Sequence, residues 1–380
     1  MVESTPPQPD LSLLIPNEPP RIQTSEDLDS ILAHCCEHNA SDITFQTGTH
    51  VIADCYGKLL QVTNRPLSNS EVGQLLNSIY GSNGTTQLLS GVDIDTYYEF
   101  RPNRYMRYRF RVNGTACLVE GHDGIQITLR SIPIDPPELS SLDLPQPILE
   151  TIKPQDGVVY VCGTTGSGKS TLLASIIRDI IEEPECHRKI LTYEAPIEFV
   201  YDNITKLSAI VSQSEIPRHI PSFADGVRNA LRRKPRLILV GESRDSETIN
   251  AVIEAALTGH PVYTTVHSNG VGETVRRLVG SFPQEERYAK SIDIMETARL
   301  IVWQMLVPAT NGQRVALREF LSFDEETRDI LLKKDLERVA DFAREMVIEK
   351  GQSMLDDAKK KFEEGLIEQR TLDIIKKGFE

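Results

Sequence analysis

The residues VVYVCGTTGSGKST, at positions 158–171, decide the fold of this chain. They join an apolar run at 158–162 to a glycine-rich turn, and a helix-forming segment at 172–181 follows. Gly163, Gly168, Lys169 and Ser170 satisfy the pattern G-x-x-x-x-G-K-[ST] of a phosphate-binding loop. A chance glycine-rich turn is the alternative, but the order of the flanking segments favours the loop. The stretch therefore predicts a nucleoside triphosphate site between a strand and a helix.

The residues of this loop share one task, which is to surround phosphate oxygens with hydrogen-bond donors. Glycines allow φ > 0, so that backbone N–H groups point inward, and the start of the following helix adds its positive dipole end. Lys169 can reach the β- and γ-phosphates, and the Ser170 hydroxyl can ligate Mg²⁺. We expect nucleotide contacts from Gly163, Thr164, Thr165, Gly166, Ser167, Gly168, Lys169, Ser170 and Thr171.

Composition excludes several classes of protein. A chain of 380 residues, 39% hydrophobic and 25% charged, is expected to form two or three domains with a large core. The formal net charge of −14 argues against a general nucleic-acid binder, which is usually basic. We find no apolar run of about 18 residues and no secretory signal pattern at the N-terminus. Six scattered cysteines without C-x-x-C spacing predict reduced thiols in the cytosol.

The first part of the chain predicts a disordered leader and a small α+β domain. Residues 1–23 are rich in proline and show no periodicity, which is typical of disorder, although a short apolar patch lies at 11–15. Thr24 with Asp27, and Ser68 with Glu71, have the spacing of capping boxes at the starts of two helices. Three short strands are expected between these helices, at 43–46, 51–55 and 59–62. We therefore place a domain at residues 24–132.

Arginines alternate with apolar residues in the segment RYRFRV, at 107–112. As a strand, this segment sends Tyr108, Phe110 and Val112 to the core and its three arginines to the opposite face. The dipeptide Asn113-Gly114 directly after it predicts a hairpin turn.

A further strand at 125–130 alternates in the same way and places Arg130 on its polar side. Like charges on one face repel each other, so this face needs negative charge opposite it. Two interpretations remain open. Carboxylates such as Glu99 and Glu120 could balance a solvated face, or the arginines could meet a phosphate or an acidic partner surface.

Prolines mark a linker at 133–150, and the pattern after it alternates strands with helices, as in a parallel sheet covered on both faces. The expected strands lie at 158–162, 189–193, 237–240 and 262–267, and the helices at 170–181, 223–232 and 246–257. We assign 151–323 to this domain. Residues 324–380 contain no proline and predict a helical C-terminal tail. The run at 359–361 is interpreted as a solvated helix face, with membrane or partner docking as the alternative.

Candidate catalytic residues follow the predicted strands. Glu242 ends the apolar strand at 237–240 in a Walker B arrangement, and Glu194 ends the strand at 189–193, with Glu198 four residues later. Ligands of open α/β sheets bind at the carboxyl ends of strands, so these carboxylates should face Mg²⁺ or a water. His260 and His267 stand at either end of the strand at 262–267. Each is either a structural histidine or part of the site.

In combination, these motifs resemble those of the PilT and GspE type of secretion ATPases, over about residues 24–330. Four motifs stand in the order of that family: Walker A at 163–170, an Asp box at 192–198, Walker B at 237–242 continuing as GESRD, and a His box at 258–267. The segments at 40–42 and 109–113 resemble its PAS-like domain. Within the family, the chain resembles the type IVB (Dot/Icm) branch first and the plasmid-conjugation relatives second. The resemblance implies a PAS-like α+β domain, then a RecA-like P-loop ATPase domain.

The resemblance also implies roles for single residues. Lys169 would bind the phosphates, and Ser170 the Mg²⁺. Glu194 would act as general base or position the attacking water, Glu242 would support Mg²⁺ and that water, and His267 would contact the γ-phosphate. The separate roles of Glu194 and Glu242 stay open. Family arginines act on the nucleotide of an adjacent subunit, and the candidates here are Arg111, Arg130, Arg228 and Arg232.

What the family implies for the whole chain is a homo-hexameric ATP hydrolase that uses Mg²⁺ and powers translocation or assembly of a type IVB secretion system. Its expected partners are inner-membrane secretion proteins and a second cytosolic secretion ATPase, with no specific nucleic acid. The expected location is the cytoplasm, with recruitment to the inner membrane. The alternatives are a pilus retraction motor, a conjugative motor, or a nucleotide-gated scaffold with little turnover. Ala195 departs from the family, because retraction motors carry aspartate at that position.

Overall fold

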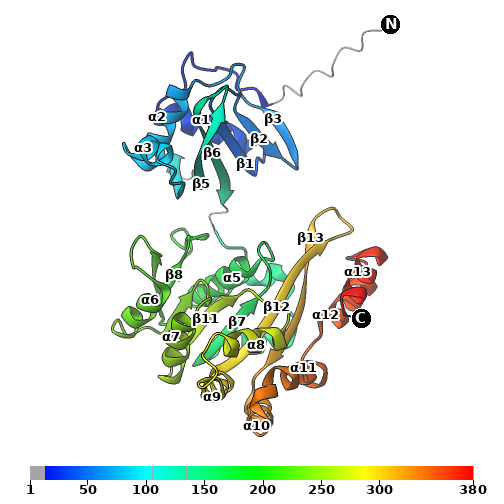
Figure 1. The fold of residues 1–380 in the computed structure, drawn as a ribbon. Helices are drawn as coiled ribbons and strands as arrows, with labels where there is room; N and C mark the ends of the chain where they lie inside the picture. The colour runs from blue at the N-terminus through cyan, green and yellow to red at the C-terminus, as the bar shows by residue number, and fades with distance from the viewer. Residues whose placement is uncertain (1–12, 105, 133–134, 380) are drawn as a thin grey trace. The chain divides into compact units, whose positions relative to one another are not determined.

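The computed structural model describes residues 13–104, 106–132 and 135–379. The chain forms two compact units, residues 1–134 and 135–380, each with its own sheet (Figure 1). Among the described residues, no helix combines the length and the hydropathy that a bilayer crossing requires.

The first unit is an antiparallel sheet with three helices. Its strands are β1 (Asp42–Gln46), β2 (Ile52–Cys55), β3 (Lys58–Gln61), β4 (Ile94–Asn103), β5 (Met106–Val119) and β6 (His122–Ile132). Its helices are α1 (Ser25–Glu37), α2 (Asn69–Tyr80) and α3 (Gly84–Leu89). The strand order is β3-β2-β1-β6-β5-β4, and every neighbouring pair is antiparallel.

Both predicted capping boxes are confirmed. The Thr24 hydroxyl accepts a hydrogen bond from the backbone N–H of Asp27 at 3.1 Å, and the Asp27 carboxylate accepts one from the N–H of Thr24 at 3.0 Å. Ser68 and Glu71 exchange the same pair of bonds at the start of α2. Each box satisfies two N–H groups that a helix start would leave without partners.

The predicted disordered leader is wrong for residues 13–23, because this segment packs into the core of the first unit. Leu13, Ile15 and Ile22 are buried there. The N–H of Ile15 donates to the carbonyl of Val62 at 2.9 Å, and the N–H of Ile22 donates to Glu71 at 2.9 Å. Burying one large aliphatic side chain contributes about 1.5–3 kcal/mol, which offsets the entropy of ordering the segment. Residues 1–12 lie outside the described residues.

The predicted hairpin turn at Asn113-Gly114 is also wrong, because both residues lie inside β5. Asn113 pairs with Asp95 on one side and with Thr128 on the other, so the strand is held along both edges. The turn to β6 is made instead by Glu120 and Gly121, with φ values of 49° and 82°. Two positive φ values in succession are those of a type I′ hairpin turn.

The second unit is built on a seven-stranded sheet. Its strands are β7 (Gly157–Cys162), β8 (Lys189–Glu194), β9 (Ile210–Glu215), β10 (Leu237–Val240), β11 (Pro261–Val266), β12 (Ala298–Pro308) and β13 (Arg314–Ser322). The order is β13-β12-β7-β11-β10-β8-β9, and only β13 runs antiparallel to its neighbour. The four predicted strands are confirmed within one residue at each end, and β9, β12 and β13 were not predicted. The predicted α/β fold, with an N-terminal α+β domain followed by a domain built on a largely parallel sheet, is confirmed.

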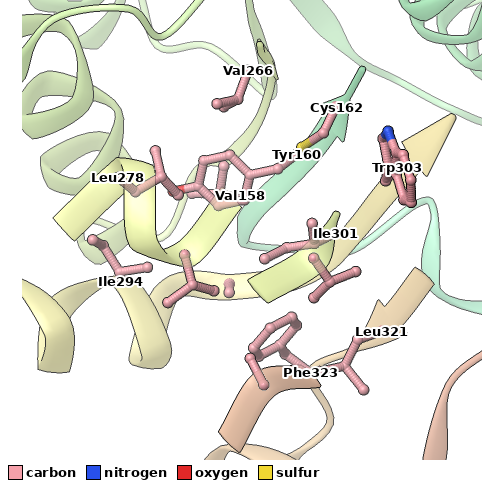
Figure 2. Close-up of a cluster of buried hydrophobic side chains, with 14 of the residues drawn as sticks. Val158, Tyr160, Cys162, Val266, Leu278, Ile294, Ile301, Trp303, Leu321 and Phe323 are labelled. Atoms are coloured by element: carbon pink, nitrogen blue, oxygen red, sulfur yellow. The ribbon is translucent and has the colours of Figure 1, made fainter. Parts of the chain in front are cut away.

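Both faces of this sheet are covered by helices, as the side chains of β7 require. Val158, Tyr160 and Cys162 point into one core, and Val159 and Val161 into the other. Figure 2 shows the first core, where Tyr160 lies near Leu278 and Ile294. This face carries α6 (Phe223–Leu231), α7 (Ser246–Leu257), α8 (Val271–Gly280) and α9 (Arg287–Thr297), and the other carries α4 (Gln146–Thr151) and α5 (Lys169–Glu182).

The segments expected as a linker and a tail belong to this unit. Within 133–150, η2 (Leu139–Leu142) and the start of α4 bury Leu139 and Ile148 in the second core. The helical prediction for 324–380 is confirmed by α10 (Glu325–Leu332), η3 (Leu336–Arg338), α11 (Val339–Lys350), α12 (Met354–Glu363) and α13 (Gln369–Phe379). Their apolar sides contribute Val347, Met354 and Leu372 to the first core. Residues 133–134 lie outside the described residues.

Two buried tyrosines on neighbouring strands offer a test of this packing. The hydroxyl of Tyr160 has no hydrogen-bond partner among the described residues, whereas that of Tyr263 donates to the carbonyl of Ile152 at 2.7 Å. We expect Tyr160→Phe to raise the free energy of unfolding by about 1 kcal/mol and Tyr263→Phe to lower it by about 1 kcal/mol. Urea unfolding followed by the fluorescence of Trp303, the single tryptophan, measures both. A comparable loss for Tyr160→Phe would contradict the packing described.

Candidate nucleotide-binding site

The site is assembled at the carboxyl edge of the sheet, where hydrogen bonds continue between the strands after the strands themselves end. The N–H of Gly163 donates to the carbonyl of Val266 at 3.3 Å, that of Gly241 to Tyr193 at 2.7 Å, and that of Ser243 to Thr265 at 2.9 Å. These bonds tie the loop after β7 to the end of β11, and the loop after β10 to the ends of β8 and β11. Residues from four adjacent parallel strands therefore meet at one edge.

A cavity of about 420 Å³ lies at this edge. It is lined by residues 165–171, by Glu194 at the end of β8 and Glu198 after it, by Glu242 after β10 and by His267 after β11. The same surface includes Phe199, Tyr201, Phe223 and Leu306. Walker A, the Asp box, Walker B and the second histidine of the His box thus share one cavity.

The glycine-rich loop has the backbone that its sequence predicts. Gly163, Gly166 and Gly168 have φ values of 149°, 77° and 82°, which lie in the region that favours glycine. A Cβ at Gly163 would come within 2.4 Å of the carbonyl oxygen of Gln304, so no larger residue fits there. Gly168 is the N-cap of α5, so the N-terminal end of this helix faces the cavity.

Lys169 is the first residue of α5 and is 8% exposed. Its ammonium group donates to the carbonyls of Gly163 and Thr164 at 2.9 and 2.8 Å. Burial lowers the pKa of this ammonium group, and the nearby Cys162 and Glu242 act in the opposite direction. The carbonyls hold the positive charge at the loop, where a triphosphate would compete with them for it.

Two neighbours orient the Glu194 carboxylate. Its Oε1 accepts a hydrogen bond from the hydroxyl of Thr192 at 2.6 Å and one from the amide of Gln213 at 3.1 Å. Thr192 lies in β8 and Gln213 in β9, so both donors come from rigid strands. The arrangement suits a carboxylate that positions a water or accepts its proton.

Glu242 and His267 lie side by side, with 3.6 Å between Oε1 and Nε2. Burial and the charge of Lys169 lower the pKa of His267, and the Glu242 carboxylate acts against both. The neutral imidazole is therefore favoured at neutral pH. Because folding lowers this pKa, the stability it contributes is present above about pH 6.5 and is lost as the pH falls below that value.

The residues fit Mg²⁺ in the way that nucleotide sites usually hold it. No group of three or more His, Cys, Asp or Glu side chains among the described residues could hold a metal alone. Ser170 and Glu242 both line the cavity. Mg²⁺ in such sites takes one or two protein ligands and binds phosphate and water oxygens as well.

The four candidate arginines do not belong to the lining of this cavity. Arg111 and Arg130 pair with each other across β5 and β6, and each is bound to an aspartate: Arg111 to Asp95 at 2.8 Å and Arg130 to Asp42 at 2.8 Å. Arg228 binds Asp225 and Glu247. The Arg232 guanidinium donates to the carbonyl of Arg228 at 3.2 Å. Their predicted action on a neighbouring subunit stays a prediction.

The prediction for the segment RYRFRV, at 107–112 in β5, is confirmed in part. Phe110 and Val112 are buried in the core, and Tyr108 packs against it. Glu99 pairs with Arg107 at 2.6 Å and with Arg109 at 3.4 Å, so the carboxylate interpretation holds for these two. Arg109 is buried, which a solvated face does not predict.

The sequence alone did not identify Thr192 and Gln213 as hydrogen-bond donors to Glu194. It also did not identify Tyr201, which lines the cavity, or Gln304, which contacts the loop. Gln304 carried a usable signal, because it is a single amide inside the apolar run LIVWQMLV at 300–307. Gln213 carried none, since β9 has no clear apolar pattern. His260 lies at the amino end of β11, where its Nδ1 is 3.2 Å from the carbonyl of Ala255, and it does not line the cavity.

Comparisons with known proteins agree on one family. Residues 104–316 match the family described as Type II/IV secretion system protein. The structure of the Legionella pneumophila ATPase DotB is similar over 96% of this chain and 99% of its own, with 64% identity and a TM-score of 0.86. The pilus retraction motor PilT, solved with bound ADP, is 30% identical over 90% of this chain and 94% of its own, with a TM-score of 0.78. The type IV pilus retraction ATPase PilT of Pseudomonas aeruginosa is 30% identical over 80% of this chain and 85% of its own.

The electrostatics of the cavity give a prediction for His267. In the absence of nucleotide and Mg²⁺, NMR titration of its imidazole should show a pKa below the usual 6.5. Glu242→Gln should lower this pKa further, because it removes the charge that favours the imidazolium. Lys169→Met should raise it, because it removes a positive charge. A His267→Gln spectrum assigns the signal. If the pKa of His267 changed in neither variant, or changed by the same amount and in the same direction in both, the two charges would not act on His267.

Proposed function

The chain belongs to the Type II/IV secretion system family and is an ATPase of the PilT/GspE superfamily, and we propose that it works as a homo-hexameric motor of a type IVB (Dot/Icm-like) secretion system. In this proposal, ATP hydrolysis powers translocation of substrates or assembly of the secretion complex. The similarity to DotB over nearly the whole chain supports the type IVB assignment.

The charge of the cavity is the observation that carries the motor proposal. Among the described residues that line it, three are carboxylates, namely Glu194, Glu198 and Glu242, and Lys169 is the only lysine or arginine. A triphosphate adds several negative charges to this set. Like charges repel each other where water is scarce, so positive charge beyond that of Lys169 would favour bound ATP.

Two sources of that charge are proposed. Mg²⁺, held by the Ser170 hydroxyl and supported by Glu242, would neutralise charge on the phosphate oxygens. Arginines of an adjacent subunit would supply the rest, and Arg111, Arg130, Arg228 and Arg232 are the candidates. Arginines that act in this way lower the barrier by several kcal/mol in other phosphoryl-transfer enzymes. A site completed by a neighbour is active only in an assembly, which is why a ring is part of the proposal.

The chemical step follows from the groups that line the cavity. Lys169 and the loop N–H groups hold the β- and γ-phosphates. A water oxygen forms a bond to the γ-phosphorus while the bond to the bridging oxygen of ADP breaks, and the water proton passes to a carboxylate. Glu194 is proposed for that carboxylate because Thr192 and Gln213 hold its Oε1 in place. His267, as a neutral imidazole, would donate a hydrogen bond to the γ-phosphate.

The proposed setting is the cytoplasm, with recruitment to the cytoplasmic face of the inner membrane. The proposed partners are inner-membrane secretion proteins and a second cytosolic secretion ATPase. No nucleic acid is proposed, because the net charge of −14 opposes a polyanion. The type IV pilus retraction motors are the second candidate, since PilT is 30% identical over most of the chain. Conjugative transfer is a further variant of the same motor chemistry.

Glu194→Gln separates a motor from a nucleotide-gated scaffold. The amide keeps the shape of the side chain but cannot accept the proton, so turnover should fall by about 10²-fold or more while ATP binding persists. Secretion in a complemented strain should be lost together with turnover. Lys169→Ala should lose binding, turnover and secretion, and Glu254→Gln, on the exposed side of α7, should keep all three. Secretion that survives Glu194→Gln would identify a scaffold.

A further inference from the structure

Gln304 lies in β12 behind the glycine-rich loop and is 3% exposed. Its amide nitrogen donates to the carbonyl of Ser167 at 2.7 Å. The loop rests directly on this residue: a Cβ at Gly168 would lie 2.9 Å from the Gln304 amide nitrogen. Gln304 does not line the cavity, so it can act on a nucleotide only through the loop.

The direction of the Gln304 amide is set by a second buried side chain, Arg318 of β13. The Nε of Arg318 donates to the Gln304 side-chain oxygen at 2.9 Å. A guanidinium has donors and no acceptor, so the amide must turn its oxygen to Arg318. The NH₂ group then necessarily faces Ser167. Both partners require the same orientation, because the Ser167 carbonyl can accept only from the NH₂ group and the Arg318 Nε can donate only to the amide oxygen.

Arg318 is itself fixed on its other side. It is 3% exposed, and its two terminal nitrogens donate to the carbonyls of Asp143 and Leu142 at 3.0 and 2.9 Å. Its backbone N–H donates to Asp357 of α12 at 2.8 Å. A buried cation costs several kcal/mol unless hydrogen bonds compensate for the lost water, and here carbonyl oxygens supply them. Apolar side chains would fill the same space at lower cost, so this charge calls for a role.

The effect on the loop follows from peptide geometry. In a planar trans peptide, the C=O and the N–H point in opposite directions. Because the Ser167 carbonyl points at Gln304, the N–H of Gly168 points away from β12. Gly168 lines the cavity, so this orientation presents its N–H to the phosphate site.

We propose that Gln304 and Arg318 are positioning residues for the nucleotide, which fix the Ser167–Gly168 peptide in the orientation that binds phosphate. Through Arg318 the loop is also tied to Leu142 and Asp143, at the end of η2. The inference rests on nucleotide binding at the loop and not on the motor function.

The test compares nucleotide affinity with stability in the full-length chain. Gln304→Glu keeps the shape and can pair with Arg318, but offers no donor to Ser167. Gln304→Met removes the donor without adding charge, and Arg318→Met removes the group that orients the amide. Tyr263→Phe is the matched control, because it removes a buried hydrogen bond of the same sheet away from the loop. The dissociation constant of a fluorescent ADP analogue and the urea midpoint from Trp303 fluorescence are measured for each.

We expect all three test variants to bind ADP about tenfold more weakly, as the loss of one buried hydrogen bond predicts. KM for ATP should rise by a similar factor, with kcat within about threefold of the unchanged chain. Tyr263→Phe should lower the midpoint and leave the affinity within twofold. Affinities within twofold in the three variants would overturn the proposal, because the network would then be structural only. Weak binding in Gln304→Glu alone would also overturn it, since charge would be the cause. The dissociation constant of the ADP analogue is measured without ATP turnover, so it tests the role of Gln304 and Arg318 even if the proposed motor function is wrong.

Discussion

The parallel register of β8, β10, β11 and β7 is the constraint on which the site depends. Each strand ends close to a functional group: Glu194 is the last residue of β8, Glu242 lies two residues after β10, His267 lies one residue after β11, and the glycine-rich loop begins directly after β7. The hydrogen bonds from Gly163, Gly241 and Ser243 extend the sheet beyond those ends and limit how far the loops can move. A shift of one residue in any strand would turn its functional side chain to the wrong face of the sheet.

The charges that line the cavity can be compared with the ion pairs that arginines form in the first unit. The lining of the cavity combines three carboxylates with a single lysine, while two of the candidate arginines are bound to aspartates of the first unit, in the pairs Arg111–Asp95 and Arg130–Asp42. Arg130 is 71% exposed and Arg111 48%, so neither pair contributes much stability. Weak, exposed pairs can exchange one anionic partner for another at low cost. Arg111 and Arg130 could therefore leave these aspartates for a bound nucleotide in the proposed assembly.

Features of the fold and the site that depend on neighbouring residues could be predicted from the sequence, whereas features that depend on distant residues could not. The P-loop, the carboxylates after strands and the capping boxes depend on local chemistry, so Thr24, Lys169 and Glu242 could be placed from spacing alone. Asn113-Gly114 failed because pairing along both edges of β5 outweighed a local turn preference. The leader at 13–23 failed because three apolar side chains find a core that composition does not reveal. Gln213, Gln304 and Arg318 act through residues distant in sequence, and only the folded sheet brings them to the site.

In the proposed mechanism, the site of one chain becomes a complete ATPase only when another chain contributes positive charge. The most direct measurement is ATP turnover against protein concentration, with light-scattering mass on the same samples and Lys169→Ala as the blank. We expect turnover per chain to rise as the mass increases from that of one chain toward that of a ring. Turnover that is abolished by Lys169→Ala but independent of mass would contradict it, because the site would then be complete within one subunit.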